Sequence, residues 1–310
     1  MGVTVALLDN VESWIPRIQQ HLHPGEELLT AAQVSTAGRA NEVDAALTEG
    51  TASGLAAYPN LRFAQSMWAG VNGLLADLEL APKVIVARMV ADSLTVSMAE
   101  FVTASVLFLH RRFPVYASQQ RSATWIEHKH LAAAEYPVAI LGAGVLSQAS
   151  GEMLRAVGFP VAMWARTPRP NDPMVRHGEA GLHELLAESA AVVCLLPLTN
   201  ETNGIINAAL LARCRPGVAL VNPGRGRHVV DADLFEALDS GHVDHAILDV
   251  FTTEPLPAAH RYWSHPRVTI MPHIAASSTA DSVARAAAAG LLAFRTGQPV
   301  PNLVNRTLGY

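Results

Sequence analysis

Three ionisable residues, Arg225, Glu254 and His273, each follow an apolar run in the second half of the sequence. A guanidinium binds a carboxylate through two parallel hydrogen bonds. An imidazole with a carboxylate behind it is held in one tautomer and can give a proton to a carbonyl oxygen that becomes negative. Each residue alone has an ordinary structural explanation. The combination suits reduction of a 2-keto acid, which carries both a carboxylate and a carbonyl group.

A glycine-rich loop, Gly142-Ala143-Gly144-Val145-Leu146-Ser147, follows the apolar run 138–141 and opens a helical stretch. It fits the pattern G-x-G-x-x-G, with Ser147 at the third glycine. The first glycine allows a tight turn, and the second lets a pyrophosphate approach the N-terminus of the helix. The motif alone is weak, because glycine-rich turns are common. Its place between a strand and a helix predicts a dinucleotide-binding loop.

The residues after the next apolar run predict which dinucleotide binds. An acidic residue roughly 20 positions after the loop would accept a hydrogen bond from the ribose 2′-OH of NAD(H). The sequence has Arg166 and Thr167 there, and no carboxylate in 164–169. Because an arginine fork matches a 2′-phosphate, we expect NADP(H) to be preferred over NAD(H). The ordinary alternative is a solvated loop arginine.

These residues need strands that end at one edge of a sheet. Apolar runs alternate with helical stretches along the chain, which predicts parallel sheets covered on both faces. The runs are 3–8, 44–47, 61–65 and 84–87 in the first part, and 138–141, 161–164, 191–196, 218–221, 246–250 and 268–271 in the second. The second set matches a doubly wound dinucleotide-binding domain, whose ligands bind at the carboxyl ends of the strands.

Two further helices are expected around this second set. A long apolar helix begins at Ser97 and is predicted to end at Pro114, and the polar segment 118–136 is interpreted as a connection or an exposed arm. An alanine-rich helix over 279–295 is expected to return to the first domain, because alanine lets backbones approach closely. The predicted domains are therefore a cofactor domain, 98–276, inserted within a substrate-binding domain, 1–97 and 277–310.

Composition limits the function classes. The chain has 310 residues, of which 50% are apolar and 16% charged, with 22 Lys and Arg against 27 Asp and Glu. The net charge of −5 argues against nucleic acid as the main partner and against a polybasic membrane surface. Only two cysteines are present, which favours a reducing compartment, and no apolar stretch reaches about 18 residues before a charge interrupts it. We expect a cytoplasmic protein.

Five motifs together resemble the D-isomer-specific 2-hydroxyacid dehydrogenase family. They are G-A-G-V-L-S at 142–147, L-L-P-L-T-N-E-T-N-G-I-I-N at 195–207, V-N-P-G-R-G at 221–226, L-D-V-F-T-T-E-P-L-P at 248–257 and M-P-H-I-A-A at 271–276. The segments Q-S-M-W-A-G-V at 65–71 and M-A-E-F at 98–101 are similar to the glyoxylate/hydroxypyruvate reductase subgroup. The resemblance implies two doubly wound parallel-sheet α/β domains, with the Rossmann domain inserted within a flavodoxin-like one.

The resemblance also implies a role for each matching residue. Arg225 would bind the substrate carboxylate, and His273 would be the acid/base with Glu254 as its partner. Backbone N–H groups of the loop before a helix would hold the same carboxylate, at Trp68, Ala69 and Gly70. Asp249 would accept from the nicotinamide amide, beside further cofactor contacts at Gly142, Gly144, Val145, Leu146, Arg166, Thr167, Leu196, Pro197, Thr202, Asn222 and Pro223.

Some features leave alternatives open. Glu49 lies in a segment expected to face the substrate, where the subgroup has apolar or aromatic groups. It could repel a second substrate carboxylate or point to solvent, so the exact 2-keto acid stays open. Trp68 and Trp263 are pocket or core aromatics. The histidine pairs His21/His23 and His128/His130 are surface groups, and no metal site is expected.

Two other functions compete with this hypothesis. One is a non-catalytic NAD(P)H-sensing interaction protein on the same fold, against which the intact trio of Arg225, Glu254 and His273 argues. The other is a dehydrogenase for a different small acid, such as formate or phosphoglycerate, whose relatives often carry an extra domain or long insertions. By resemblance we expect a homodimer formed through the cofactor domain, using the helix from Ser97 and the arm after it.

Overall fold

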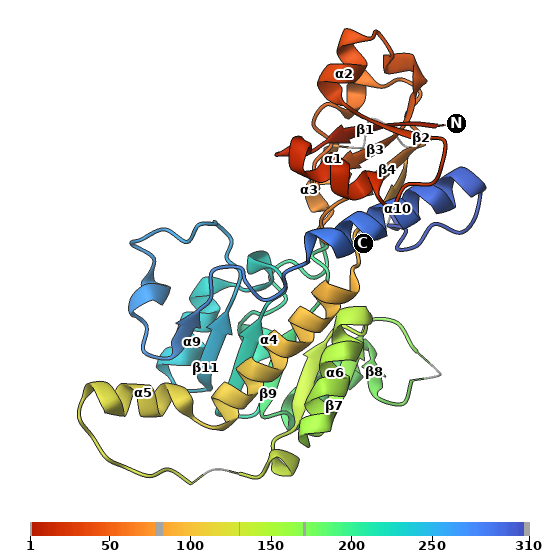
Figure 1. Cartoon of the computed structure of the whole chain (residues 1–310). Coiled ribbons are helices and arrows are strands. Elements are labelled where there is room, and N and C mark those ends of the chain that lie inside the picture. Colours follow the sequence, from red (N-terminus) through yellow and green to blue (C-terminus); the bar gives the residue numbers. More distant parts are fainter. Residues whose placement is uncertain (1, 78–82, 130, 170–171, 307–310) are drawn as a thin grey trace. The chain divides into compact units, whose positions relative to one another are not determined.

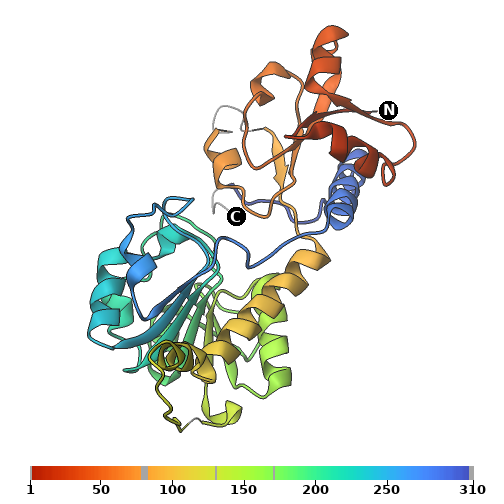
Figure 2. The same cartoon turned by 60° about the vertical axis from the view of Figure 1, so that its left-hand side comes forward.

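The computed structural model describes residues 2–77, 83–129, 131–169 and 172–306. The chain divides into two compact units (Figures 1 and 2). The first unit combines Met1–Leu94 with Ser278–Tyr310, and the second is Thr95–Ser277. Each unit is an α/β structure built on one parallel sheet, so the predicted fold class is confirmed.

The first unit has a five-stranded sheet in the order β2-β1-β3-β4-β5, the order of flavodoxin-like folds. The sequence analysis missed the edge strand β2, because only Leu28 of its five residues is buried and no apolar run marks it. The elements are β1 Gly2–Leu7, α1 Val11–Gln19, β2 Glu26–Thr30, α2 Ala31–Thr36, β3 Val43–Thr48, β4 Phe63–Ser66, α3 Asn72–Asp77, β5 Ile85–Ala87 and α10 Ala280–Thr296.

Helix α10 packs against β4 and α1 of this unit. Small buried side chains, among them Ala284 and Ala287, allow the close approach. Near the end of α10, Phe294 stacks on Phe63 with ring centroids 4.9 Å apart. Beyond it, the Arg295 guanidinium donates to the buried carboxylate of Glu26 on β2 at 2.6 and 2.8 Å. The last helix is thus part of the first unit, although the second unit separates them in the sequence.

The second unit has a seven-stranded sheet in the order β12-β11-β10-β9-β6-β7-β8. This is the doubly wound dinucleotide-binding order with one more strand. The sequence analysis missed the short edge strand β8, which has one buried side chain, that of Val175. The elements are α4 Asp92–His110, α5 Phe113–Arg121, β6 Val138–Leu141, α6 Val145–Val157, β7 Val161–Ala165, β8 Val175–His177, α7 Gly178–Glu188, β9 Ala191–Cys194, α8 Ala208–Leu211, β10 Val218–Asn222, α9 Asp231–Asp239, β11 Val243–Leu248 and β12 Val268–Ile270.

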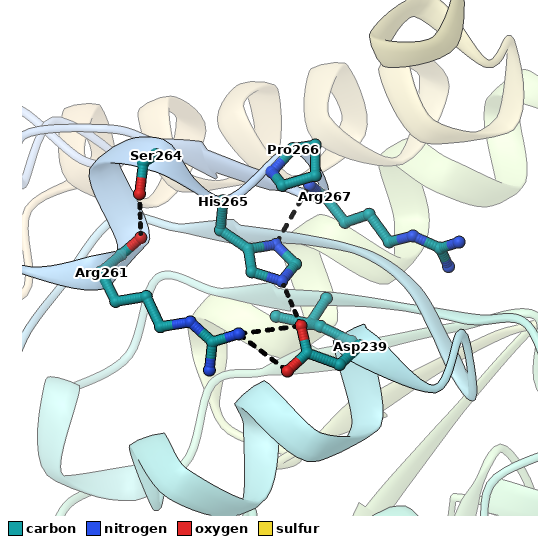
Figure 3. A pocket seen from close by; sticks show the side chains of 7 residues that line it. Asp239, Arg261, Ser264, His265, Pro266 and Arg267 are labelled. Carbon is teal, nitrogen blue, oxygen red and sulfur yellow. Dashed lines mark hydrogen bonds and ion pairs between the residues drawn. The ribbon is translucent and has the colours of Figure 1, made fainter.

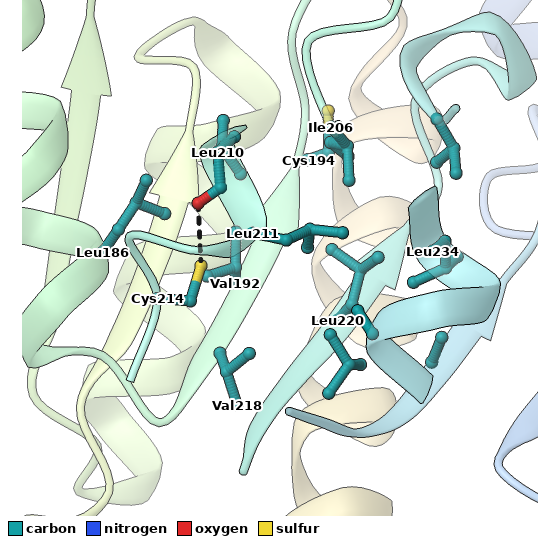
Figure 4. Close-up of a cluster of buried hydrophobic side chains, with 14 of the residues drawn as sticks. Leu186, Val192, Cys194, Ile206, Leu210, Leu211, Cys214, Val218, Leu220 and Leu234 are labelled. Atoms are coloured by element: carbon teal, nitrogen blue, oxygen red, sulfur yellow. Dashed lines mark hydrogen bonds between the residues drawn. The ribbon is translucent and has the colours of Figure 1, made fainter. Parts of the chain in front are cut away.

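Both faces of this sheet are buried. In β6, Ala139 and Leu141 belong to one apolar cluster, and Val138 and Ile140 belong to the other. Figure 4 shows part of the first cluster, in which Cys194 packs among uncharged, apolar side chains. Burial on both faces explains why these strands read as continuous apolar runs in the sequence.

Helix α4 ends earlier than predicted. It stops at His110, and Arg112 takes a left-handed conformation before α5 begins. Pro114 lies in the first turn of α5, where a missing N–H costs nothing, so the prediction that Pro114 ends the long helix is wrong. By length and composition α4 could cross a membrane, but half of that stretch is buried, with Val102 and Val106 fully inside the core.

Candidate active site

The three predicted catalytic residues lie at one edge of the seven-stranded sheet. Strands β10, β11 and β12 are parallel neighbours, so their carboxyl ends meet at the same edge. Arg225 follows the end of β10, Glu254 lies in the segment after β11, and His273 follows β12. The fold thereby gathers groups that are far apart in the sequence.

The imidazole of His273 is paired with the carboxylate of Glu254. The Nδ1 atom of His273 lies 2.7 Å from Oε2 of Glu254, while Oε1 of the same carboxylate accepts the N–H of Phe251 at 2.8 Å. Nδ1 therefore carries the proton of this bond, and Nε2 has no hydrogen-bond partner among the described residues. The His273 side chain is 57% exposed. The pair thus presents one imidazole nitrogen outward.

The backbone of His273 is held in an uncommon conformation. Its φ angle is +54°, a left-handed value that side chains other than glycine seldom adopt. The buried carboxylate of Asp249 holds the following residues, because it accepts the N–H groups of Ile274 at 2.7 Å and Ala275 at 3.0 Å. The N–H of His273 donates to the Asp249 carbonyl at 2.8 Å. Asp249 therefore fixes the turn that aims His273.

This supporting role of Asp249 was missed by the sequence analysis, which assigned it only to the nicotinamide amide. Burial raises the pKa of Asp249, and the hydrogen bonds from Ile274 and Ala275 together with the His273 charge oppose the rise. A buried aspartate directly after an apolar strand was the available signal. Its contact with the cofactor stays a prediction.

The turn that carries Arg225 is held through its backbone. Asn222 is fully buried, and its Nδ2 donates to the Arg225 carbonyl at 3.0 Å. A side chain at Gly226 would collide with the backbone of Phe251, so only glycine lets these two loops touch. Since the Phe251 N–H donates to Glu254, this contact connects the Arg225 turn to the His273–Glu254 pair.

The glycine-rich loop has the form that a phosphate requires. Gly142 has a φ of +117°, and a Cβ atom there would lie 2.9 Å from the Leu195 carbonyl oxygen. Gly144 precedes the first residue of α6, and a Cβ there would meet nothing within 4 Å. The helix N-terminus thus stays open to a phosphate group. Ser147 is buried under Gly142, so serine is tolerated at the third glycine position.

Arg166 reaches the loop after β9. Its Nη1 lies 3.2 Å from Oε1 of Glu201, and both side chains are largely exposed. Thr199 donates to the same carboxylate at 2.9 Å, and this bond is the main reason that the pKa of Glu201 is lowered, with Arg166 adding to it. Glu201 was missed by the sequence analysis. Thr202 donates to the Pro197 carbonyl at 2.6 Å, which braces this loop.

The remaining predicted cofactor residues lie shortly after the ends of strands β7, β9 and β10 or in the first turn of α6. Leu196 and Pro197 lie two and three residues after the end of β9 and are partly buried, and Pro223 is buried directly after β10. Val145 in the first turn of α6 is 55% exposed, and Leu146 is partly buried. Thr167 is exposed beside Arg166.

The predicted substrate loop belongs to the five-stranded unit. The Ser66 hydroxyl donates to the Trp68 carbonyl at 2.9 Å, and α3 begins two residues beyond Gly70, as expected for a loop before a helix. Trp68 and Trp263 are 54% and 55% exposed, so the core alternative is wrong for both. Glu49 is partly buried, and burial raises its pKa, with the nearby Asp9 charge adding to the rise.

A pocket of about 280 Å³ lies at the opposite, amino edge of the seven-stranded sheet (Figure 3). The Arg261 guanidinium donates twice to Asp239 at the end of α9, at 2.9 and 2.8 Å. His265 contributes a third contact, with Nε2 3.1 Å from the Asp239 carboxylate. This pocket contains none of the predicted site residues.

No group of three or more His, Cys, Asp or Glu side chains is arranged to hold a metal ion among the residues that the structure describes. His130, one of the histidines singled out in the sequence, lies outside the described residues.

Comparison with known proteins now adds to this geometry. The family model described as "D-isomer specific 2-hydroxyacid dehydrogenase, NAD binding domain" matches residues 103–275. Glyoxylate/hydroxypyruvate reductase A of Serratia proteamaculans (strain 568) is 37% identical over 79% of this chain and 80% of its own length. The chain belongs to the D-isomer-specific 2-hydroxyacid dehydrogenase family. The resemblance inferred from the five motifs is thereby confirmed.

Further relatives support the same family membership. Glyoxylate/hydroxypyruvate reductase A of Salmonella newport (strain SL254) is 35% identical over 88% of the chain and 89% of its own length. A D-isomer-specific 2-hydroxyacid dehydrogenase of Xanthobacter autotrophicus Py2, solved with NADPH and MES, has a TM-score of 0.91 at 35% identity and covers 100% and 99% of the two chains. The NADPH-dependent glyoxylate/hydroxypyruvate reductase of Sinorhizobium meliloti, solved with NADP and sulfate, has a TM-score of 0.88 at 32% identity and covers 100% of both.

Proposed function

We propose that this chain is an NADPH-dependent reductase of a short 2-keto acid such as glyoxylate or hydroxypyruvate. The observation that carries the proposal is the His273–Glu254 pair at 2.7 Å, on the same sheet edge as Arg225. Relatives named glyoxylate/hydroxypyruvate reductase support the substrate class. The seven-stranded unit is the proposed cofactor domain, and the five-stranded unit the proposed substrate-binding domain.

The chain's own residues supply the proton and the binding charge. Bound NADPH supplies the hydride. His273 donates a proton from Nε2 to the carbonyl oxygen as that oxygen becomes negative. Glu254 fixes Nδ1 as the protonated nitrogen and stabilises the imidazolium before the transfer. Arg225 binds the substrate carboxylate and polarises the carbonyl. The N–H groups of Ala69 and Gly70 are proposed to add to the carboxylate site. The Trp68 N–H donates to the Ser66 hydroxyl at 3.1 Å, so Trp68 is proposed only to shape this loop.

The cofactor contacts follow from the open helix terminus. Gly142 and Gly144 leave the start of α6 uncovered, which suits a pyrophosphate. Arg166 is proposed to bind the 2′-phosphate, so NADP(H) is preferred over NAD(H), and relatives solved with NADPH or NADP support this preference. Asp249 is proposed to meet the nicotinamide amide, with the remaining contacts from Val145, Leu146, Thr167, Leu196, Pro197, Thr202, Asn222 and Pro223.

The direct test is the oxidation of NADPH and NADH, followed by absorbance, with a panel of 2-keto acids. The panel contains glyoxylate, hydroxypyruvate, pyruvate and a dicarboxylic 2-keto acid. We expect NADPH to be consumed with glyoxylate or hydroxypyruvate and the corresponding 2-hydroxy acid to form in equal amount. Binding of NADPH without turnover on any member would overturn the proposal and favour a cofactor-sensing protein.

We also infer that the protein is a homodimer of the cytoplasm. Apolar side chains around α5 support the dimer, because Phe113 is 49% exposed and Trp125 fully exposed, with Ile126 at 55%. Phe113 is the first residue of α5, and Trp125 and Ile126 lie in the segment after this helix. Helix α5 is labelled in Figure 1. Both cysteines are free and buried, as suits a reducing compartment. Sedimentation of the wild type and of Phe113→Asp tests the dimer, which the variant should weaken.

A further inference from the structure

His228 is a fully buried histidine that stands directly behind the proposed substrate arginine. It ends the single 3-10 turn η5, Gly226–His228. Its Nδ1 lies 3.2 Å from the backbone nitrogen of Arg225, and its Nε2 lies 3.3 Å from the carbonyl oxygen of Pro197. The ring therefore contacts both the turn of the proposed substrate arginine and the loop at Pro197 that is proposed to line the cofactor.

The partners of His228 determine where its proton sits. The Arg225 N–H can only donate, so Nδ1 is an acceptor, and the Pro197 carbonyl can only accept, so Nε2 carries the hydrogen. Burial lowers the pKa of His228 to about 4, against the raising effect of the Pro197 carbonyl, while the Arg225 charge lowers it further. At neutral pH the ring is uncharged and in this one tautomer.

The backbone N–H and the backbone carbonyl of Arg225 are thus both hydrogen-bonded to buried side chains. His228 accepts the Arg225 N–H, and Asn222 donates to the Arg225 carbonyl at 3.0 Å. The backbone of His228 is fixed as well, because its N–H donates to the Arg225 carbonyl at 3.1 Å and its carbonyl accepts the Ile206 N–H at 2.8 Å. The imidazole cannot shift without moving the arginine turn.

The Pro197 end of the contact is equally constrained. The same Pro197 carbonyl accepts the Thr202 hydroxyl at 2.6 Å, in the loop after β9. The Cys194 thiol lies 3.6 Å from Nδ1 of His228, on the inner side of the ring. Burial raises the pKa of Cys194 to about 12, so this neighbour stays a neutral thiol.

We propose that His228 is a positioning residue that sets the distance between the backbone turn that carries Arg225, the proposed substrate-binding residue, and the proposed cofactor-lining loop at Pro197. The inference rests on the proposed function of those two residues. A rigid ring with an acceptor at one nitrogen and a donor at the other links two backbone segments in a fixed geometry. Displacement of a positioned group by about 1 Å can cost on the order of 10²-fold in rate, which is why such a spacer matters.

Three substitutions remove the two ring contacts of His228, one at a time or together. His228→Asn keeps an acceptor near Nδ1 and is too short to reach Pro197. His228→Gln keeps a donor near Nε2 and removes the acceptor for Arg225. His228→Leu removes both. The measurements are the KM and kcat for the 2-keto acid, the Kd of NADPH from its fluorescence, and the melting temperature.

We expect a split between the two amide variants. His228→Asn should keep the KM for the 2-keto acid within about threefold of the wild type and raise the Kd of NADPH. His228→Gln should raise the KM and keep the Kd of NADPH within about threefold. His228→Leu should raise both the KM and the Kd about tenfold. A histidine that serves stability alone would make the asparagine and glutamine variants equal in KM and Kd, and that result would overturn the proposal. Failure of all three variants to fold would also assign His228 to stability alone.

Two further measurements keep this result separate from the proposed function. If the wild type turns over no 2-keto acid, the proposed function fails, and oxamate titrated against the NADPH complex replaces KM in the same comparison. Because His228 is neutral across the assay range, the pH profile of kcat/KM should be the same in wild type and His228→Asn. A shifted acid limb in that variant would contradict the positioning role.

Discussion

Two histidine–carboxylate pairs occupy opposite edges of the seven-stranded sheet and do different things. At the amino edge, His265 uses both ring nitrogens inside the protein. Its Nδ1 accepts the Arg267 N–H at 3.2 Å, and its Nε2 lies 3.1 Å from Asp239 (Figure 3). At the carboxyl edge, Glu254 is the one hydrogen-bond partner of the His273 ring within the described part of the chain, and it meets Nδ1. The His273 side chain is 57% exposed, against 6% for His265.

The difference shows that residue type alone does not make a catalytic pair. The Asp239 carboxylate is fully engaged, because Arg261 donates to it twice and His265 adds a third contact. These contacts, first that of Arg261, lower the pKa of Asp239. At the carboxyl edge Nε2 of His273 has no hydrogen-bond partner among the described residues, and the backbone of His273 is held in a strained conformation. We therefore expect a catalytic role for His273 and a structural role for His265.

A large difference in kcat/KM is expected between variants of the two arginines at these edges. Arg225→Ala should lower kcat/KM by on the order of 10²-fold or more, because the substrate carboxylate loses its partner. Arg225→Lys keeps the charge without the planar fork and should recover only part of the loss. Arg261→Ala at the amino edge is the matched control and should leave kcat/KM within about twofold. Equal losses in Arg225→Ala and Arg261→Ala would break the comparison.

Next in size is an acid-induced loss of stability that comes from two buried histidines. Burial lowers the pKa of both His228 and His245 to about 4, against 6.5 in the unfolded chain. Between pH 6.5 and 4 the unfolded state binds more protons, so the free energy of unfolding falls as the pH falls through this window. The contribution lost at pH 5 is roughly 2 kcal/mol for each histidine.

Urea unfolding at pH 7 and pH 5 measures this effect. His228→Asn, which cannot titrate, should lose less stability between the two pH values than the wild type. A wild type whose stability is the same at pH 7 and pH 5 would contradict neutral burial of these two histidines.

A smaller effect is expected in cofactor preference. Arg166→Asp should reduce the preference for NADPH over NADH by about tenfold or more, because a carboxylate suits the 2′-OH and repels the phosphate. Glu201→Gln releases Arg166 from its ion pair. It should lower the Kd of NADPH a few-fold and leave the Kd of NADH unchanged. Glu188→Gln, which removes the nearer of the two carboxylates beside Arg176 elsewhere on the unit, is the control. An unchanged KM ratio in Arg166→Asp would rule out Arg166 as the phosphate ligand.

The smallest effect is expected at the amino edge itself. Asp239→Asn weakens the contacts to Arg261 and His265 but touches no proposed substrate or cofactor residue. It should lower the melting temperature by a few degrees at most and leave turnover unchanged, since exposed ion pairs contribute little. A clear loss of kcat with an unchanged melting temperature would show that the amino edge takes part in catalysis.

The sequence predicted the buried strands and the residues at their ends, because burial on both faces leaves continuous apolar runs that point to one edge. It missed β2 and β8, which are short edge strands with one buried side chain each. It also placed the end of α4 at Pro114, although a proline in the first turn of a helix starts α5 instead.

The supporting contacts of the site were beyond prediction. Asp249, His228 and Glu201 reach partners that are 25, 31 and 35 residues away or that depend on a particular turn. Such pairings arise only when neighbouring strands are in register, and no local periodicity records them. The candidate catalytic residues could be proposed from their types and spacing, but the residues that hold them in place could be identified only from the fold.

The most direct test exchanges the same residue type at both edges and compares kcat for the 2-keto acid with NADPH. His273→Gln should lose on the order of 10²- to 10⁴-fold in kcat while still binding NADPH, because the proton donor is gone. His265→Gln should keep kcat within a few-fold and lower only the melting temperature. Near-normal turnover in His273→Gln, or an equal loss in His265→Gln, would contradict the account.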